Sequence, residues 1–124
     1  MIVVLFDASA IRDIFAADGV PEALSGRAVI NVAATSVDAI SSLAAFVVAA
    51  GGNLSEVTIV DYPPAVRDRA GEFIIASDEE HAVRWLALYR NLGTKVHHIG
   101  TVGNASRAEM AVWMPYMFQT ISIS

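Results

Sequence analysis

Cysteine is absent from the 124 residues of this chain. Disulfide frameworks, thiol catalysis and cysteine-based zinc sites are therefore excluded. Basic residues are also few, because eight Lys and Arg stand against thirteen Asp and Glu, which gives a net charge of −5. The eight are scattered along the chain, so the sequence lacks the basic patch that binding to nucleic acid or to an anionic membrane requires.

Long apolar runs are missing as well. The longest stretch, around Leu43–Ala50, is far shorter than the ~20 residues of a membrane-spanning helix. Met1 is followed by an apolar, β-branched run that ends in the acid Asp7, which predicts a strand rather than a secretory leader. We therefore expect a cytoplasmic protein with neither a membrane nor a nucleic acid as partner.

Three motifs of known chemistry are absent too. The sequence contains no G-x-G-x-x-G, no G-x-x-x-x-G-K-[ST] and no G-x-S-x-G, so it has no dinucleotide fingerprint, phosphate loop or nucleophile elbow of its own. Apolar residues are nevertheless abundant, at 55 % against 17 % charged, where about 45–50 % and 25 % are usual. This excess predicts that part of the surface is covered by another molecule.

Strands and helices are predicted to alternate along the chain. Continuous apolar runs, typical of strands buried on both faces, alternate with segments of helical spacing that begin at Ser or Thr and end at Gly. The predicted strands are 2–6, 28–32, 53–60, 72–76 and 96–99; the predicted helices follow Ser9, lie at 21–24, start at Thr35 or Ser36, start at Ser77, and lie at 106–118, with 61–71 as a loop. The pattern predicts one α/β unit with a mostly parallel sheet.

Ligands bind beyond the carboxyl ends of parallel strands, which directs attention to the residues that follow each predicted strand. These are Asp7, Thr35, Ser36, Asp61 and Tyr62. Each has a structural alternative, since Asp7 fits a turn cap, Thr35 and Ser36 fit helix caps, and Asp61 and Tyr62 fit ordinary loop positions.

The histidines do not predict a metal site. His97 and His98 are neighbours on a predicted strand and so point to opposite faces, and His81 is expected to be solvated at the start of a helix. A phosphoacceptor receiver domain is also disfavoured, because it needs a lysine at the end of its last strand and Lys95 stands at the beginning.

The order of segments resembles the β-hydroxyacid dehydrogenase and imine reductase superfamily, whose NAD(P)-binding domain is of the 6-phosphogluconate dehydrogenase type. The resemblance covers nearly the whole chain. The fourth strand and following helix of that Rossmann domain are similar to segments 2–7 and 10–15, and its fifth strand with the turn near the nicotinamide is similar to 26–36. The strand–helix–strand that closes the domain is similar to segments 72–78 and 92–100, and the interdomain helix is similar to 103–117.

This resemblance implies the C-terminal half of a Rossmann-type NAD(P)-binding domain at 1–102 and the start of an interdomain, dimerising helix at 103–124. The family's glycine-rich turn would precede Met1 and its helical C-terminal domain would follow Ser124. The expectation is therefore a truncated oxidoreductase that is inactive as this fragment.

Two departures within the superfamily favour the imine reductase side. The double proline in Ile59–Pro64 is similar to the imine reductase loop, whereas hydroxyacid dehydrogenases carry Ser-Gly-Gly there. The catalytic lysine of the hydroxyacid enzymes would fall at Glu109, and an acid cannot replace its cationic proton donation. The implied reaction is NADP(H)-dependent hydride transfer to a C=N or C=O bond of a small imine or carbonyl substrate, with NAD(H) as the alternative cofactor.

The resemblance also implies site residues but no catalytic one. Residues expected beside the cofactor are Leu5, Phe6, Asp7, Asn31, Ala34 and Thr35, and those expected near the substrate are Asp61 and Tyr62. The apolar 106–118 helix implies a homo-oligomer. The alternative function is a non-catalytic α/β module that docks on a partner through this helix.

Overall fold

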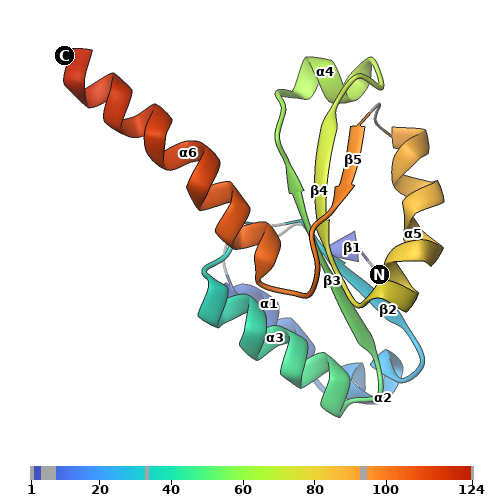
Figure 1. The fold of residues 1–124 in the computed structure, drawn as a ribbon. Coiled ribbons are helices and arrows are strands. Elements are labelled where there is room, and N and C mark those ends of the chain that lie inside the picture. Colours follow the sequence, from blue (N-terminus) through green and yellow to red (C-terminus); the bar gives the residue numbers. More distant parts are fainter. Residues whose placement is uncertain (1, 4–7, 33, 93–94, 124) are drawn as a thin grey trace.

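A five-stranded sheet, with its strands side by side in chain order, organises the structure (Figure 1). This computed structural model describes residues 2–3, 8–32, 34–92 and 95–123. The strands are β1 (Ile2–Val3), β2 (Ala28–Asn31), β3 (Asn53–Ile59), β4 (Glu72–Ala76) and β5 (Lys95–His98). Among the described strands, the β3–β4 pair alone is antiparallel, which confirms the predicted α/β class with a mostly parallel sheet.

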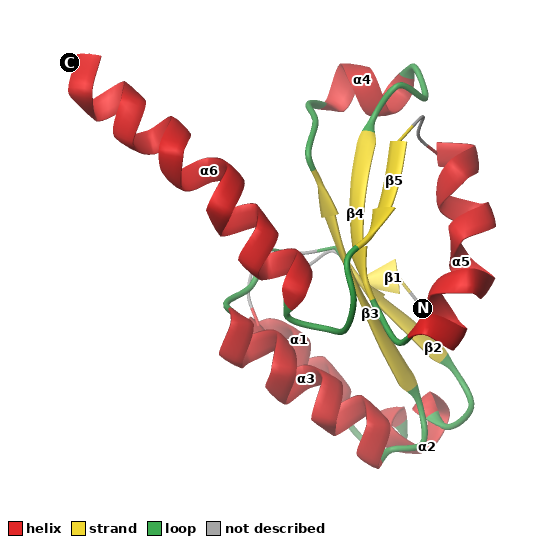
Figure 2. Ribbon diagram, in the orientation of Figure 1, coloured by secondary structure: helices red, strands yellow, loops and turns green. Residues whose placement is uncertain are grey.

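Helices cover both faces of the sheet (Figure 2). One face carries α1 (Ala8–Phe15) and α3 (Val37–Ala49), and the other carries α5 (Glu79–Leu92). The two short helices α2 (Val20–Leu24) and α4 (Pro63–Arg67) lie in connections. The last helix, α6 (Asn104–Ile123), starts against the sheet and then runs away from it (Figure 1).

Each face of the sheet has its own apolar core. On the α1 and α3 face, Ile11, Phe15, Val29, Leu43 and others pack together, and Phe15 stacks on Phe46 with ring centroids 6.2 Å apart. On the α5 face the buried residues are Ile30, Val57, Phe73, Ile75 and Tyr89. Neighbouring strand residues such as Val29 and Ile30 serve opposite cores, as the two-residue period of a strand requires.

The reversal at β4 moves one helix to the opposite end of the sheet. The connection after β3 turns through α4, so β4 runs back along β3 toward the end of the sheet where β2 and β3 begin. Consequently α5 starts near the beginnings of β2 and β3, while α3 and α6 start beside the middle of the sheet, close to the end of β2 (Figure 1).

Several boundaries differ from those predicted. The 61–71 segment is not all loop, because Pro63 and Pro64 open α4, where the missing N–H of proline has no helical partner to lose. Ser77 does not cap α5; the helix begins at Glu79 and the Ser77 hydroxyl forms a hydrogen bond with Ser55 at 3.0 Å. Val83, which lies at helical spacing from Leu86 and Tyr89, is 68 % exposed, whereas Tyr89 is buried.

The strands β2 to β5 and the short helix α2 agree with the prediction within a residue or two. The helix predicted at 106–118 is longer, since α6 ends five residues later, at Ile123, and α1 begins at Ala8 and so includes Ser9, which was predicted to precede it. Ile2–Val3 form a strand, and residues 4–7 of that predicted strand lie outside the described part of the chain. Ser36 rather than Thr35 caps α3. No described helix combines the length and hydropathy that crossing a membrane requires.

Two adjacent valines on α3 test the core assignment. Val47 is 0 % exposed and Val48 is 61 % exposed. We expect Val47→Ala to lower the free energy of unfolding by about 2 kcal/mol, because it removes buried methyl groups and leaves a void. Val48→Ala should change it by less than about 0.5 kcal/mol. Equal effects in urea denaturation would contradict the packing of α3.

Candidate functional site

Six polar side chains gather where β2 and β3 meet the beginnings of α3 and α6. We call this set the polar cluster: Asn31, Glu56, Thr58, Ser106 and Glu109, to which we add Thr35 because it lies between the end of β2 and the start of α3. It lies at the carboxyl ends of two parallel strands, which is where open α/β sheets bind their ligands.

Glu56 is the buried centre of the polar cluster. Its side chain is 2 % exposed, and its carboxylate accepts hydrogen bonds from the Gly103 N–H at 2.8 Å and from the Ser106 hydroxyl. Both donors belong to the first turn of α6 or the residue before it, so the carboxylate also faces the positive end of that helix. Gly103 has φ +100°, a conformation that favours glycine and that aims its N–H at Glu56.

Glu109 extends the cluster along the same face of the sheet. It lies on α6, and its Oε2 accepts a hydrogen bond from the Thr58 hydroxyl at 3.4 Å. Thr58 and Glu56 are two residues apart on β3, so they project from the same face. Glu109 is only partly buried, so a second carboxylate of the cluster remains accessible.

The turn after β2 supplies an available hydroxyl. The Ser36 side chain caps α3 by accepting a hydrogen bond from the Ala39 N–H at 3.2 Å. Thr35 is thereby released from capping, and its buried Oγ1 has no hydrogen-bond partner among the described residues. A buried hydroxyl without a partner is destabilising unless a ligand or water completes it. Ala34, next to it, is exposed.

The residues predicted beside the cofactor fall into two groups. The first group, Asn31, Ala34 and Thr35, lies at the carboxyl end of β2. Asn31 is 1 % exposed and pairs in register with Glu56 on β3. Leu5, Phe6 and Asp7 lie outside the described residues.

The residues predicted near the substrate lie further along the chain, between β3 and α4. The Asp61 carboxylate accepts a hydrogen bond from the Glu72 N–H at 3.0 Å, which ties the β3–β4 connection together. Tyr62 is 70 % exposed and precedes α4. Among the described residues, neither side chain has a hydrogen bond to the polar cluster.

The sequence pattern does not predict three members of the cluster: Glu56, Thr58 and Ser106. For Glu56 the sequence contains one signal, because an acid in the middle of the strand 53–60 contrasts with the apolar residues around it. A buried charge requires partners, but those partners lie 47 and 50 residues away in the sequence and cannot be found from spacing.

The histidines are engaged in other contacts. The His97 Nε2 lies 2.6 Å from Glu72 Oε1, and the His98 Nε2 lies 2.9 Å from the Ser77 carbonyl oxygen. Over the described part of the chain, no three His, Asp or Glu side chains are grouped so that they could hold a metal ion. His81, expected to be solvated, is instead partly buried, and its Nδ1 is shielded from solvent.

An apolar hollow lies on the other face of the sheet. Its volume is about 190 Å³, and the side chains that line it are aliphatic except for those of Phe73 and Tyr89. The Tyr89 hydroxyl is buried with no hydrogen-bond partner among the described residues, and burial raises the pKa of Tyr89 well above its usual range. The tyrosine is therefore in its neutral, protonated form at neutral pH.

The sheet, its crossovers and the polar strand ends define a Rossmann-like α/β unit. Solved oxidoreductases share this fold over almost the whole chain. An imine reductase from Myxococcus stipitatus in complex with NADP+ matches with a TM-score of 0.89 and 16 % identity over 98 % of this chain. The Mycobacterium tuberculosis 3-hydroxyisobutyrate dehydrogenase, solved with L-serine, matches with a TM-score of 0.87 and 19 % identity, also over 98 %.

A protein from Pseudomonas putida KT2440 described as an oxidoreductase is more similar in sequence, at 26 % identity and a TM-score of 0.82 over 98 % of this chain. The chain spans 41–43 % of the length of these three proteins. No protein-family model and no curated protein sequence matches it. The similarity confirms the expected fold resemblance to imine reductases and 3-hydroxyisobutyrate dehydrogenases.

Replacing Glu56 tests whether it anchors α6. We expect Glu56→Ala to lower the free energy of unfolding by about 2–3 kcal/mol, because it leaves the Gly103 N–H and the Ser106 hydroxyl buried without an acceptor. Glu56→Gln keeps one acceptor oxygen and should cost about 1 kcal/mol. Asp13→Ala, at an exposed position of α1, is the control in chemical denaturation. An unfolding free energy unchanged by Glu56→Ala would show that α6 is held by other contacts.

Proposed function

We propose that this chain forms the nicotinamide-proximal part of an NAD(P)(H)-dependent oxidoreductase of the imine reductase type. The polar cluster lies at the sheet edge where such a cofactor would bind, and the fold is shared with an imine reductase in complex with NADP+. The bound cofactor would supply the hydride, while this chain would supply orientation and electrostatics.

The residues present fit one end of a dinucleotide. The Thr35 hydroxyl is buried and without a partner among the described residues, and the exposed Ala34 leaves the space beside it open. We propose that Thr35, Ala34 and Asn31 flank the nicotinamide, together with the preceding segment Leu5, Phe6 and Asp7. NADP(H) is the proposed cofactor and NAD(H) the alternative, since an imine reductase variant from M. stipitatus was solved in complex with NAD+.

The charge of the polar cluster favours a C=N substrate over a hydroxy acid, and Glu109 is the observation that carries this choice. Its carboxylate, held by Thr58 at 3.4 Å, lies on the accessible side of the cluster. A protonated imine is a cation and is stabilised beside a carboxylate, whereas a hydroxy acid is an anion and is repelled by it. Reduction of a small imine is therefore the proposed reaction, with a carbonyl compound as the second substrate class.

The chain is proposed to be incomplete as a catalyst. It spans 41–43 % of the oxidoreductases that share its fold, and it contains no G-x-G-x-x-G turn to hold a pyrophosphate at a helix N-terminus. We propose that residues 1–102 are part of the cofactor domain and that 103–124 begin the helix to a second domain. The chain by itself should not reduce an imine.

A cofactor fragment can test the proposed site directly in this chain. We expect nicotinamide mononucleotide to shift the backbone NMR signals of Thr35, Ser36 and Thr58, with an affinity in the millimolar range because the pyrophosphate and adenosine contacts are missing. Thr35→Val should weaken binding about fivefold, since it removes the available hydroxyl but keeps the side-chain shape. The exposed Thr101 provides the matched control, Thr101→Val.

Two results would contradict this assignment. Equal shifts with adenosine monophosphate would remove the preference for the nicotinamide end. The absence of any shift at the polar cluster would favour the docking module instead. Oxidation of NADPH by this chain in the presence of 1-pyrroline would overturn the proposed incompleteness while leaving the assigned chemistry intact.

Exposed apolar side chains on different sides of α6 support the proposed homo-oligomer. Met110 is 56 % exposed and Val112 is 48 % exposed on a helix that leaves the sheet (Figure 1). We propose that a second copy of the chain covers the 106–118 segment, because apolar side chains on a projecting helix are stabilised by a matching apolar face.

Charge placed on α6 tests this oligomer. We expect Met110→Glu to convert dimers or larger species to monomers in sedimentation velocity, because burying an unpaired carboxylate is unfavourable. Val83→Glu, on the exposed side of α5 at 68 % exposure, should leave the oligomeric state unchanged. A monomeric parent chain, or the same sedimentation profile for both variants, would refute a contact through α6.

A further inference from the structure

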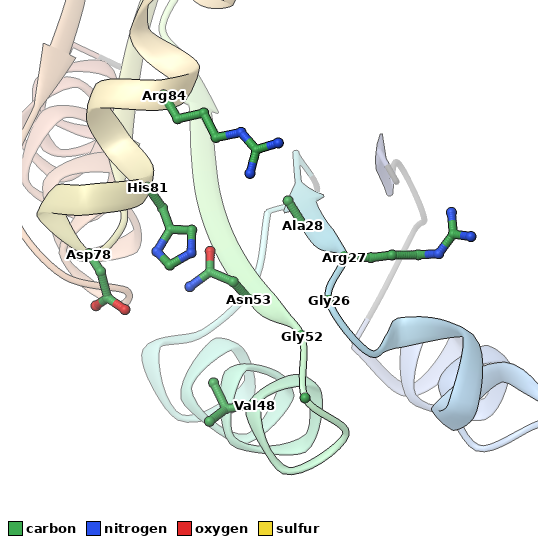
Figure 3. Close-up of a pocket in the computed structure, with 10 residues that line it drawn as sticks. Gly26, Arg27, Ala28, Val48, Gly52, Asn53, Asp78, His81 and Arg84 are labelled. Carbon is green, nitrogen blue, oxygen red and sulfur yellow. The ribbon is translucent and has the colours of Figure 1, made fainter.

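A second pocket lies at the opposite edge of the sheet from the polar cluster. Its volume is about 320 Å³, and it is bounded by the starts of β2 and β3, the end of α3 and the first turns of α5 (Figure 3). Small-molecule sites begin at about this size, so the pocket suits a small ligand. The reversal of β4 creates it, because that reversal brings the start of α5 to this edge.

Three polar side chains supply the chemistry of this pocket. Arg84 reaches from α5 toward the start of β2, and the His81 ring faces Asn53 (Figure 3). The Asn53 Oδ1 and the His81 Nδ1 are both shielded from solvent and have no hydrogen-bond partner among the described residues. Two unsatisfied atoms at one pocket are destabilising unless something that enters the pocket completes them.

The Arg84 guanidinium is a cation without an acidic partner in the described part of the chain. The one ion pair found there joins His97 to Glu72, and Arg84 instead has its guanidinium carbon 5.4 Å from the ring centroid of Trp85. This contact orients the guanidinium and leaves its N–H groups available as donors. Arg27 also lines the pocket, although its side chain extends away from Arg84 (Figure 3).

Nearby charges and hydrogen-bonding groups bear on the kind of anion that fits. Asp78 lines the pocket, and Glu79 and Glu80 follow it in the first turn of α5. These carboxylates repel a phosphate dianion about twice as strongly as a carboxylate monoanion at the same distance, and Arg84 attracts the dianion about twice as strongly as well. Charge alone therefore does not choose between the two anions, and the hydrogen-bonding groups of the pocket decide. The shielded Asn53 Oδ1 accepts hydrogen bonds, so it favours a ligand that also carries a donor.

We propose that this pocket binds a small organic carboxylate that bears a hydroxyl group. The carboxylate forms a charge-assisted hydrogen bond with Arg84, and the hydroxyl donates to Asn53 beside His81. The site is separate from the polar cluster: the pocket opens beside Asn53, the first residue of β3, whereas Thr58 of the cluster is near the last. The proposal does not depend on the proposed oxidoreductase function.

Glycolate and acetate, which differ by one hydroxyl, test the proposal in this chain by NMR titration. We expect glycolate to shift the signals of Asn53, His81 and Gly52 with a dissociation constant in the millimolar range, as suits a ligand of this size. Acetate should bind at least threefold more weakly, because it offers no donor to Asn53. Inorganic phosphate should bind more weakly than glycolate.

Variants identify the residues responsible. Arg84→Met should weaken glycolate binding about tenfold, because it removes the cation but keeps an unbranched side chain over Trp85. Arg90→Met, at an exposed position later in α5, should change it less than twofold. Asn53→Ala should abolish the difference between glycolate and acetate while leaving acetate binding unchanged, which separates a lost contact from a lost fold.

Four outcomes would overturn the proposal. Glycolate could fail to saturate at any concentration, or shift Thr35 and Thr58 in place of Asn53 and His81, which would put the acid at the polar cluster. Arg84→Met and Arg90→Met could weaken binding equally, which would indicate screening of net charge. Phosphate could bind more tightly than glycolate, which would make this an inorganic anion site.

Discussion

One buried carboxylate, that of Glu56, joins β3 to the start of α6 and so holds the polar cluster together. Glu56 is surrounded by protein, and a charge in that position is tolerated only because the Gly103 N–H, the Ser106 hydroxyl and the beginning of α6 compensate for its lost hydration. Because both donors come from one helix start, the same compensation fixes where α6 leaves the sheet. Glu109 lies further along the same helix, so the hydrogen bonds to Glu56 at the helix start also determine that Glu109 reaches Thr58.

Local chemistry in the sequence predicts most of the elements but few of the contacts. Apolar runs predict the strands, and the limits of α3 are predicted by Ser36 at its start and by Gly51 and Gly52 after its end. Each of these signals acts on neighbours within a few residues. The role of Ser77 is not predicted in this way, because its hydroxyl forms a hydrogen bond with Ser55, 22 residues away in the sequence. The hydrogen bonds of Glu56 and the partial burial of His81 are likewise not predicted from neighbouring residues. Both depend on which strands become neighbours and on the reversed direction of β4, and no local pattern specifies either.

The fold of this chain is compatible with more than one reaction, so the proposed reaction depends on particular side chains. Imine reductases and hydroxyacid dehydrogenases share this fold with the chain at 16–19 % identity in the examples compared, so the architecture alone does not separate C=N from C=O reduction. The proposed preference for a C=N substrate rests on the sign of the charge at the strand ends. An acid at position 109 next to the neutral Thr58 makes this edge attractive to a cationic substrate. The Thr35 hydroxyl, which has no hydrogen-bond partner among the described residues, does not bear on that choice, and its place beside the cofactor is part of the proposal.

The strand β3 passes from one candidate site to the other within seven residues. Its first residue, Asn53, lines the pocket beside α5, while Glu56 and Thr58 serve the polar cluster. A slip of one residue in its pairing would turn every side chain to the opposite face. Insertions or deletions in β3 would therefore remove both sites together, whereas length changes in the α4 connection would leave both in place. Evolutionary variation in this molecule should accordingly accumulate around α4 and spare the length of β3.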